Sequence, residues 1–428
     1  MFHDALIVQR SLRLLPQLRQ RLSWSRKQLR QHQLGALQRL VRHAYEHTDL
    51  YRRLYDDAGV KPADLRTLDD FSQWPTVDKR TLREAFPQAA IARSARASSL
   101  VTGTTSGSTG EPFRFVLDAN TVAHKIAGNW RSMELAGYRV GRDRLLQFSP
   151  PGRVVGEWTR RLGDLLLRRR CLDPQSIDCV QALAVIRRVQ PTVLFGWTSY
   201  LRTLAEYLTE HGWQVPVRSV ITTSEMLCSD DRKLIGRAFA APVYDQYGST
   251  EFGRLATEVP DSGGLLVNAD LAYLETHGTY DAEDGVVGEL LVTSLVNYAM
   301  PFIRYRIGDL GRFANEPAAG FPAFPVLERL EGRVHDMLTR MDGTPVMPQF
   351  VHRVLREYEE IDRYQVIQHT TAHCEVRMRM RVPFTESRAE DVKRRFSHQL
   401  GGAAVSLSCG SEFVTKTSKS QQVISYLC

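Results

Sequence analysis

The stretch VLFGWTSYLRTLAEYLTEHGWQVPVRSVITTSEMLCSDDRKLIGRAF, residues 193–239, decides the fold class. Its apolar runs at 193–195 and 220–222 have the length of buried strands. Each run is followed by a segment with apolar residues at helical spacing, 201–211 and 229–239. Strands that alternate with helices in this way are typical of a parallel sheet covered by helices. We therefore expect an α/β domain with parallel α/β layers.

The flanking segments extend this domain and add a second one. Residues 1–95 show helical spacing and predict a helical lead-in. Strand-like runs follow closely at 288–293 and 301–305, which favours an antiparallel, distorted β-barrel-like subdomain. The mixed helix and strand pattern near the C-terminus predicts a small α+β lid domain. We expect a large core domain at 1–335 and the lid at 336–428.

Composition and charge narrow the class of protein. The 428 residues include six cysteines without a CxxC pair and carry a net charge of +8. Because no apolar run reaches the roughly 18 residues that span a bilayer, we expect no transmembrane segment. Charged residues interrupt the apolar start, so we predict no signal peptide and a cytoplasmic protein. The basic clusters at 10–30 and 168–170 are solvated helix faces or contact an anionic partner; no module for nucleic acid is present.

The loop TGTTSGSTGEP, residues 102–112, combines three glycines with six hydroxyl residues. Glycines let backbone amides approach a bound anion, and hydroxyls add rotatable donors. The loop is therefore suited to a polyphosphate, although no lysine follows its last glycine as in a P-loop. A polar linker is the alternative interpretation of this segment by itself.

Four further motifs follow in order. In YDQYGSTE, residues 244–251, an aromatic ring beside a glycine offers a wall for a purine, and the glutamate suits Mg²⁺. In RYRIGD, residues 304–309, the aspartate can accept hydrogen bonds from a ribose diol. EGRVHD at 331–336 offers a cation, and TKTSK at 415–419 offers lysines. Each segment alone also reads as an ordinary turn, linker or solvated lysine.

Taken together, the five motifs resemble those of the adenylate-forming superfamily, which contains acyl-CoA synthetases, adenylation domains and luciferases. The chain looks most like the phenylacetate–CoA ligase branch with its CapK-like proteins. The segments HAYEHTDLY at 43–51 and NYAMPFIRY at 297–305 also resemble that branch. The resemblance implies an enzyme that uses ATP and Mg²⁺ to convert a carboxylic acid to an acyl-adenylate, and then transfers the acyl group to CoA.

The resemblance also implies a role for each matching residue. The β- and γ-phosphates would be wrapped by Thr105, Ser106, Gly107, Ser108, Thr109 and Gly110. The adenine site would comprise Ser224, Glu225, Asp245, Gln246, Tyr247 and Gly248. Glu251 would hold Mg²⁺, with Thr250 near the α-phosphate; Asp309 would bind the ribose hydroxyls with the help of Arg333. Lys419 would be the catalytic lysine and Asp336 the hinge.

Three departures from the family pattern bear on these roles. Ser418 replaces the usual glycine before the catalytic lysine, and Lys416 lies close enough to leave the register open between Lys416 and Lys419. Phe113 stands where many members carry a lysine. Residues 252–268 contain no cysteine, so we expect no zinc of the kind that some branch members hold there.

The acid and its acceptor remain open at this stage. The branch favours aryl acids, and Trp197, Tyr200 and Tyr244 lie where the acid pocket is expected, although ordinary core packing explains them equally well. CoA is the first acceptor to consider; a carrier-protein thiol or an amine is the alternative. A nucleotide-binding protein without catalysis is the hypothesis of another class. A homodimer is compatible with the sequence.

Overall fold

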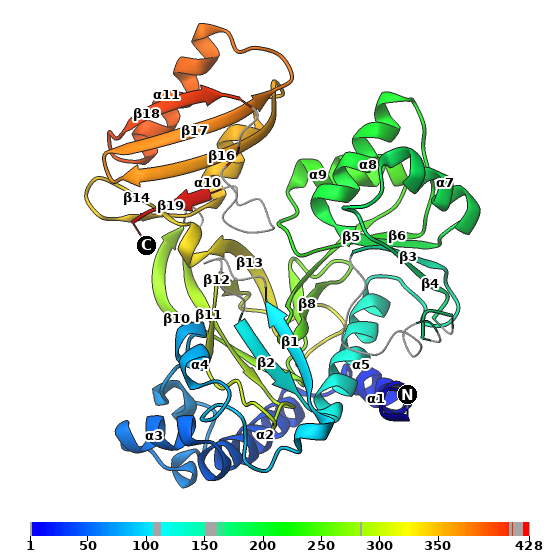
Figure 1. The fold of residues 1–428 in the computed structure, drawn as a ribbon, viewed down its shortest axis with the longest axis vertical. Helices are drawn as coiled ribbons and strands as arrows, with labels where there is room; N and C mark the ends of the chain where they lie inside the picture. Colours follow the sequence, from blue (N-terminus) through cyan, green and yellow to red (C-terminus); the bar gives the residue numbers. More distant parts are fainter. Residues whose placement is uncertain are drawn as a thin grey trace.

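The computed structural model describes residues 2–105, 113–149, 161, 163–165, 167–282, 285–410, 413 and 423–427. The chain forms a large part around an eleven-stranded sheet and a smaller part around a four-stranded sheet. The smaller, C-terminal part lies at one end of the large one (Figure 1). This is the expected fold class of a large α/β domain with a small α+β domain.

The parallel half of the large sheet contains β3 (Leu145–Phe148), β4 (Arg169–Leu172), β5 (Val193–Trp197), β6 (Ser219–Thr223) and β7 (Val243–Ser249). One face carries α7 (Cys179–Val189), α8 (Thr198–Glu210) and α9 (Ser229–Phe239), whose apolar residues pack on Leu194 and Val220. The other face carries α5 (Ala119–Leu135). The strands and helices expected within residues 193–239 are thus confirmed as β5, β6, α8 and α9.

The antiparallel half continues the same sheet, because β8 pairs antiparallel with β7. It contains β8 (Gly253–Glu258), β9 (Leu265–Val267), β10 (Ala272–Ala282), β11 (Gly285–Ser294), β12 (Tyr305–Phe313) and β13 (Val326–Arg333). The strand expected at 301–305 is wrong. Pro301 has no N–H to donate and Arg304 has a φ of 46°, so extended pairing begins only at Tyr305.

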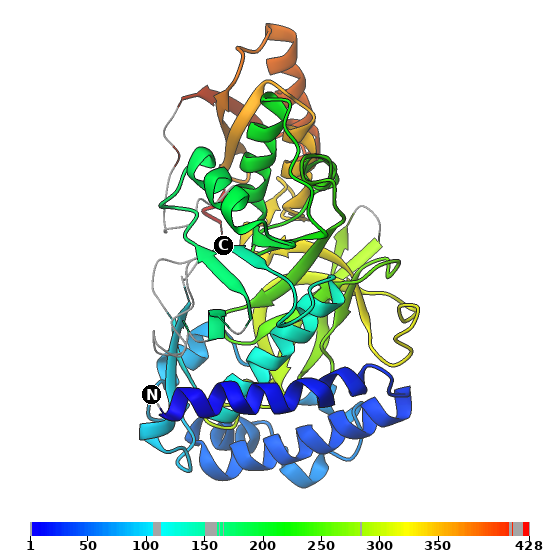
Figure 2. The same ribbon diagram turned by 90° about the vertical axis from the view of Figure 1, so that its right-hand side faces the viewer.

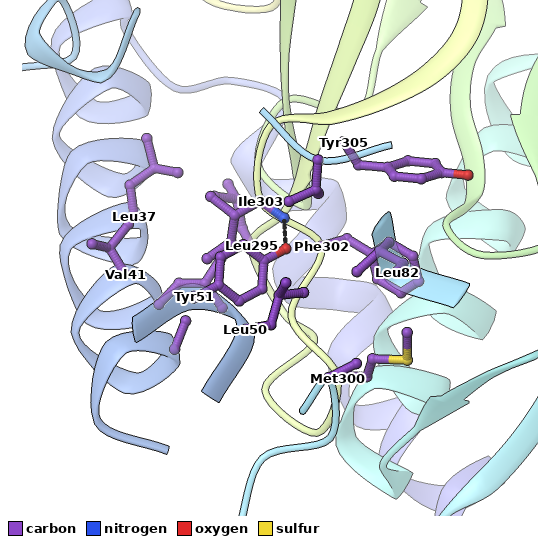
Figure 3. Close-up of a cluster of buried hydrophobic side chains, with 14 of the residues drawn as sticks. Leu37, Val41, Leu50, Tyr51, Leu82, Leu295, Met300, Phe302, Ile303 and Tyr305 are labelled. Atoms are coloured by element: carbon purple, nitrogen blue, oxygen red, sulfur yellow. Dashed lines mark hydrogen bonds between the residues drawn. The ribbon is translucent and has the colours of Figure 1, made fainter. Parts of the chain in front are cut away.

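A helical layer covers the bottom of the large part, as Figure 2 shows. It contains α1 (Phe2–Arg21), α2 (Arg26–His47), α3 (Asp49–Asp57) and α4 (Lys79–Ala85), with 3₁₀ turns η1 (Pro62–Asp64), η2 (Asp70–Gln73) and η3 (Ala97–Ser99). The hairpin of β1 (Val101–Thr105) and β2 (Phe113–Leu117) lies above it. Leu37 and Val41 pack with Phe302 and Ile303 in one core, where the Tyr51 hydroxyl accepts a 3.0 Å hydrogen bond from the Ile303 amide (Figure 3).

A buried ion pair fixes α5 to the antiparallel half of the sheet. Arg131 of α5 is 1% exposed and donates to both carboxylate oxygens of Asp270, at 2.6 and 3.0 Å. It also donates to the Asn268 side chain at 2.7 Å. Breaking such a buried pair leaves an uncompensated charge, so α5 is held firmly in place.

The C-terminal part begins after η4 (Val334–Asp336). It contains β14 (Leu338–Thr339), β15 (Pro345–Val346), α10 (Gln349–Arg356), β16 (Ile361–Thr370), β17 (His373–Met380), α11 (Glu386–Gln399), β18 (Ala404–Cys409) and β19 (Val423–Ser425). Its sheet has the order β18-β17-β16-β19 and its own core of residues such as Val376 and Phe396. It contacts the large part through Arg356 with Asp231 at 2.5 Å and Arg381 with Glu206 at 3.0 Å. No helix within the described ranges is long and apolar enough to cross a membrane.

Candidate active site

Three residues of the predicted nucleotide site meet where β7 ends beside β12 and β13. The Tyr247 hydroxyl donates a 2.7 Å hydrogen bond to one oxygen of Asp309. The Arg333 guanidinium lies 3.4 Å from the other oxygen, since Asp309 and Arg333 are paired across the two strands. Burial raises the pKa of Asp309, while the charge of Arg333 opposes that shift. A carboxylate held at both oxygens can accept hydrogen bonds from a diol in a fixed direction.

Glu251 lies next to this group. It is 8% exposed, and its carboxylate has no hydrogen-bond or ion-pair partner among the residues that the structure describes. Its negative charge acts on Lys79 and Lys125, opposing the fall in pKa that burial causes in both lysines. A carboxylate that no described side chain engages offers an oxygen ligand, which suits Mg²⁺. Glu251 therefore fits the predicted metal role.

Asp245 is the most buried acid of the predicted adenine site. Its carboxylate accepts hydrogen bonds of 2.9 Å from the Thr222 hydroxyl and from the backbone N–H of Gln246. Burial raises the pKa of Asp245 to about 6. The group is therefore fixed in position but costly to ionise.

The side chain of Gln246 lies on the opposite face of β7 from those of Asp245 and Tyr247, because successive side chains of a strand alternate. Gln246 accepts a 2.9 Å hydrogen bond from Arg254 of β8. Tyr244 shares its face and packs in the cluster of Phe195 and Ile221. β7 thus has two faces, which we name after the predicted ligands: the nucleotide face with Asp245 and Tyr247, and the acid face with Tyr244 and Gln246.

The turn between β6 and α9 supplies Ser224 and Glu225. Ser224 has a φ of 70°, which marks a sharp turn at the carboxyl end of β6. The Glu225 carboxylate accepts a 2.7 Å hydrogen bond from the Ser199 amide in the first turn of α8. That carboxylate is therefore engaged as a cap of α8, which leaves backbone groups of this turn to approach a base.

The three aromatic residues predicted for the acid pocket do not all lie together. Trp197 is the last residue of β5 and lies on the same face as Phe195. Tyr244 packs against the hydrophobic cluster that contains Phe195. Tyr200 instead packs below α7, α8 and α9, with its ring centroid 5.0 Å from that of Phe148. The acid face thus carries Trp197 and Tyr244, whereas Tyr200 is a residue of the helix-covered layer.

Several predicted residues fall outside the described part of the chain. These are Ser106, Gly107, Ser108, Thr109, Gly110, Lys416 and Lys419. Thr105, which precedes the loop, is described: its hydroxyl oxygen is buried and has no hydrogen-bond partner. An unpartnered buried donor at the start of the loop is consistent with a ligand there.

A contact that the sequence motifs do not contain holds the turn after β7. The ammonium of Lys125 in α5 donates a hydrogen bond to the Thr250 carbonyl oxygen. The side-chain oxygen of Asn129 accepts a 2.9 Å hydrogen bond from the backbone N–H of Arg254. A Cβ at Gly253 would lie 2.7 Å from Lys125, and one at Gly248 would lie 2.2 Å from the Gly253 carbonyl. Both glycines therefore permit close packing. Two polar residues four apart on a buried helix face were the only sequence signal for this clamp.

The predicted hinge residue lies within η4, between the two parts of the chain. Burial raises the pKa of Asp336 to about 6, and the charge of Arg333 opposes that shift. The position is consistent with a hinge, and the domain boundary at 336 stays a prediction.

Within the described ranges, no group of three His, Cys, Asp or Glu side chains is arranged to hold a metal ion.

Comparison with known proteins agrees with this geometry. The family model described as AMP-binding enzyme matches residues 33–298. The phenylacetate–coenzyme A ligase of Pseudomonas putida is 28% identical, over 79% of this chain and 78% of that protein. Protein CapK of Staphylococcus aureus is 24% identical, over 64% of this chain and 61% of its own length. Among solved structures, a 2-hydroxyisobutyryl-CoA ligase in complex with an acyl-AMP superposes with a TM-score of 0.75 at 22% identity, covering 95% of this chain and 91% of that one.

Since the family model covers more than half of the chain, the protein belongs to the AMP-binding enzyme family. It is an adenylate-forming carboxylate ligase, and within that class it belongs to the branch of the phenylacetate–CoA ligases and CapK-like proteins.

Proposed function

We propose that the protein uses ATP and Mg²⁺ to convert a carboxylic acid, with aromatic acids as the first candidates, to an acyl-adenylate and then forms its CoA thioester. The observation that supports this most is the convergence of Tyr247, Asp309, Arg333 and Glu251 at the end of β7. Those groups would bind a ribose, a metal ion and phosphate charge side by side. Coenzyme A is named for the phenylacetate–coenzyme A ligase and the 2-hydroxyisobutyryl-CoA ligase, and we transfer it to this chain as part of the proposal.

The chemistry follows from charge. A carboxylate oxygen of the acid bonds to the α-phosphorus of ATP while the bond from that phosphorus to the bridging oxygen breaks, and pyrophosphate leaves. Two negative groups must meet, so catalysis consists of positioning and charge neutralisation. Asp309 would orient the ribose, and Arg333 and Lys125 add positive charge near Glu251. Mg²⁺ held by Glu251 would supply neutralisation of phosphate charge.

The experiment is acid-dependent exchange of labelled pyrophosphate into ATP, run with a panel of carboxylic acids. Exchange with at least one acid is expected, because adenylation is reversible while the acyl-adenylate stays bound. Lys419→Ala should lower exchange far more than its matched control Lys416→Ala. ATP binding without exchange for every acid tested would favour a nucleotide-binding protein without catalysis.

A carrier-protein thiol or an amine is the second candidate for the acceptor, since the relative CapK is not named as a coenzyme A ligase. Mass analysis of the product after adding CoA separates the two. A mass of the acyl-CoA supports the first candidate; an adenylate that persists with CoA and is consumed by an amine or a carrier protein supports the second.

A further inference from the structure

The acid face of β7 holds a positive charge that forms no ion pair with any carboxylate in the described ranges. Arg254 extends from β8 beside Gln246, and the centre of its guanidinium lies 5.1 Å from the centroid of the Phe195 ring. None of the described carboxylates forms an ion pair with it. The acidic charge that acts on Arg254 is that of Asp245, whose carboxylate is held by Thr222 on the other face.

Burial makes this arrangement costly. It lowers the pKa of Arg254 to about 10, so the charged form is disfavoured relative to a guanidinium in water. Lys125 adds a second positive charge, which acts on Arg254 across the same turn. The charge of Glu251 also acts on Lys125, so Arg254 is the cation of the two that lacks a nearby described carboxylate on this face. A cation that is largely removed from water is normally paired with an anion.

Gln246 adds an unsatisfied donor at the same place. The residue is 2% exposed, and its side-chain oxygen accepts a hydrogen bond from Arg254. Its amide nitrogen is buried and has no acceptor. Donors of this kind are rare in folded proteins, and each one calls for a partner that the protein chain itself does not supply. Beyond the hydrogen bond between the two side chains, the Gln246 side-chain nitrogen has no acceptor and the Arg254 guanidinium has no described carboxylate as a partner.

Arg254 and Gln246 lie at the edge of the sheet where we expect the acid to bind. Gln246 is paired in register with Thr223, and Thr223 with Trp197, so it lies level with the carboxyl ends of β6 and β5. This is the edge at which open α/β sheets bind ligands. The aromatic rings of Phe195 and Tyr244 lie on the same face. An acid bound there would meet aromatic surface, the Arg254 guanidinium and the unpartnered side-chain nitrogen of Gln246.

We propose that Arg254 and Gln246 determine acid specificity and that the preferred acid carries a second carboxylate, separate from the one that is adenylated. This inference rests on the proposed function of the site and narrows its substrate class to dicarboxylic acids with an apolar body. The second carboxylate would accept charge-assisted hydrogen bonds from the Arg254 guanidinium and from the Gln246 amide.

The test uses acids in matched pairs that differ by one carboxylate: benzoate with terephthalate, phenylacetate with 4-carboxyphenylacetate, and butyrate with glutarate. For at least one pair, wild-type kcat/KM in pyrophosphate exchange should favour the diacid by about tenfold or more, because a site built for a polar group rejects analogues that lack it. Arg254→Met should reduce that preference by about tenfold or more, Arg254→Lys should keep part of it, and Gln246→Leu should lower it by a smaller factor.

A second measurement separates this proposal from the proposed function. The rise in melting temperature that the same acids cause in the protein needs no turnover. Greater stabilisation by the diacids in the wild type, lost in Arg254→Met, supports the acid site even if exchange is absent. Arg254→Met variants that lower exchange equally for both members of each pair would overturn the proposal, as would a wild-type preference for every monoacid. Gln246→Leu provides the same comparison if Arg254→Met does not fold.

Discussion

The nucleotide face and the acid face of β7 differ in how completely their polar side chains are partnered. On the nucleotide face, Asp245 is held by Thr222, and Tyr247 is bonded to Asp309. On the acid face, the Gln246 amide nitrogen has no acceptor, and Arg254 has no described carboxylate beside it. The polar groups of the nucleotide side are therefore held in place without a ligand, which favours catalysis by positioning, whereas our proposal is that a bound acid completes the acid side.

The largest effect should follow from removing the charge next to the nucleotide face. We expect Glu251→Gln to lower kcat/KM for pyrophosphate exchange by about 10²–10³-fold, since a preorganised charge at the reacting phosphate is lost. The Mg²⁺ concentration needed for half-maximal rate should rise as well. The control is Glu316→Gln, because the Glu316 side chain is 88% exposed and distant in sequence. Exchange by Glu251→Gln within threefold of wild type would contradict the metal role.

A smaller loss is expected at the ribose position. Asp309→Asn should raise the KM for ATP by about 10–100-fold, because charge-assisted hydrogen bonds are replaced by neutral ones. The sharper measurement compares ATP with 2′-deoxy-ATP. Wild type should discriminate between them and Asp309→Asn should not, while Tyr247→Phe keeps the carboxylate and most of the discrimination. Equal discrimination in wild type and Asp309→Asn would place the ribose elsewhere.

The pH dependence of stability tests how far Asp245 is buried. Its pKa is about 6 in the folded protein against an ordinary 3.8, so the folded state binds more protons between these values and stability falls as pH rises through that window. Between pH 5 and 7.5 this group should account for about 1–2 kcal/mol of the decrease in the free energy of unfolding. Urea denaturation of Asp245→Asn should show that part of the decrease removed, whereas Asp230→Asn, with a side chain 74% exposed in wild type, should not. Parallel pH profiles for wild type and Asp245→Asn would contradict this.

The smallest effect concerns the clamp from α5. Lys125→Met removes the donor to the Thr250 carbonyl and should lower kcat about threefold to tenfold, with little change in the KM for ATP, because the turn is less well positioned. Lys125→Arg should recover part of the rate, since a guanidinium can still donate. A folded Lys125→Met variant with wild-type kcat would show that the contact is not needed to place the turn.

Motifs of consecutive residues were accessible from the sequence because their chemistry is local. Residues 193–239 indicated the parallel layers. The segments around Tyr247, Asp309 and Arg333 were predicted to bind one nucleotide, and in the structure these three residues contact one another. Lys125 and Arg254 could not be found in this way. Their contacts arise when α5 packs against a turn that follows it by more than a hundred residues.

Gln246 and Tyr200 illustrate a second limit. The motif assigned Gln246 to the adenine wall together with its neighbours, but alternation in an extended strand sends its side chain to the other face. Tyr200 was assigned to the acid pocket by proximity to Trp197, but it lies one turn into α8 and packs on Phe148. If the side-chain direction of each residue had been derived from its strand or helix, Gln246 and Tyr200 would have been assigned to different faces from their neighbours in the sequence.

The central claim is that this one site joins the carboxylate of an acid to the α-phosphate of ATP. Mass spectrometry of the protein incubated with ATP, Mg²⁺ and an acid active in exchange, without CoA, tests it most directly. The account predicts an enzyme-bound acyl-adenylate with release of pyrophosphate, formed about 10²–10³-fold more slowly in Glu251→Gln. ADP and phosphate as the products, or unaltered ATP with every acid, would contradict it.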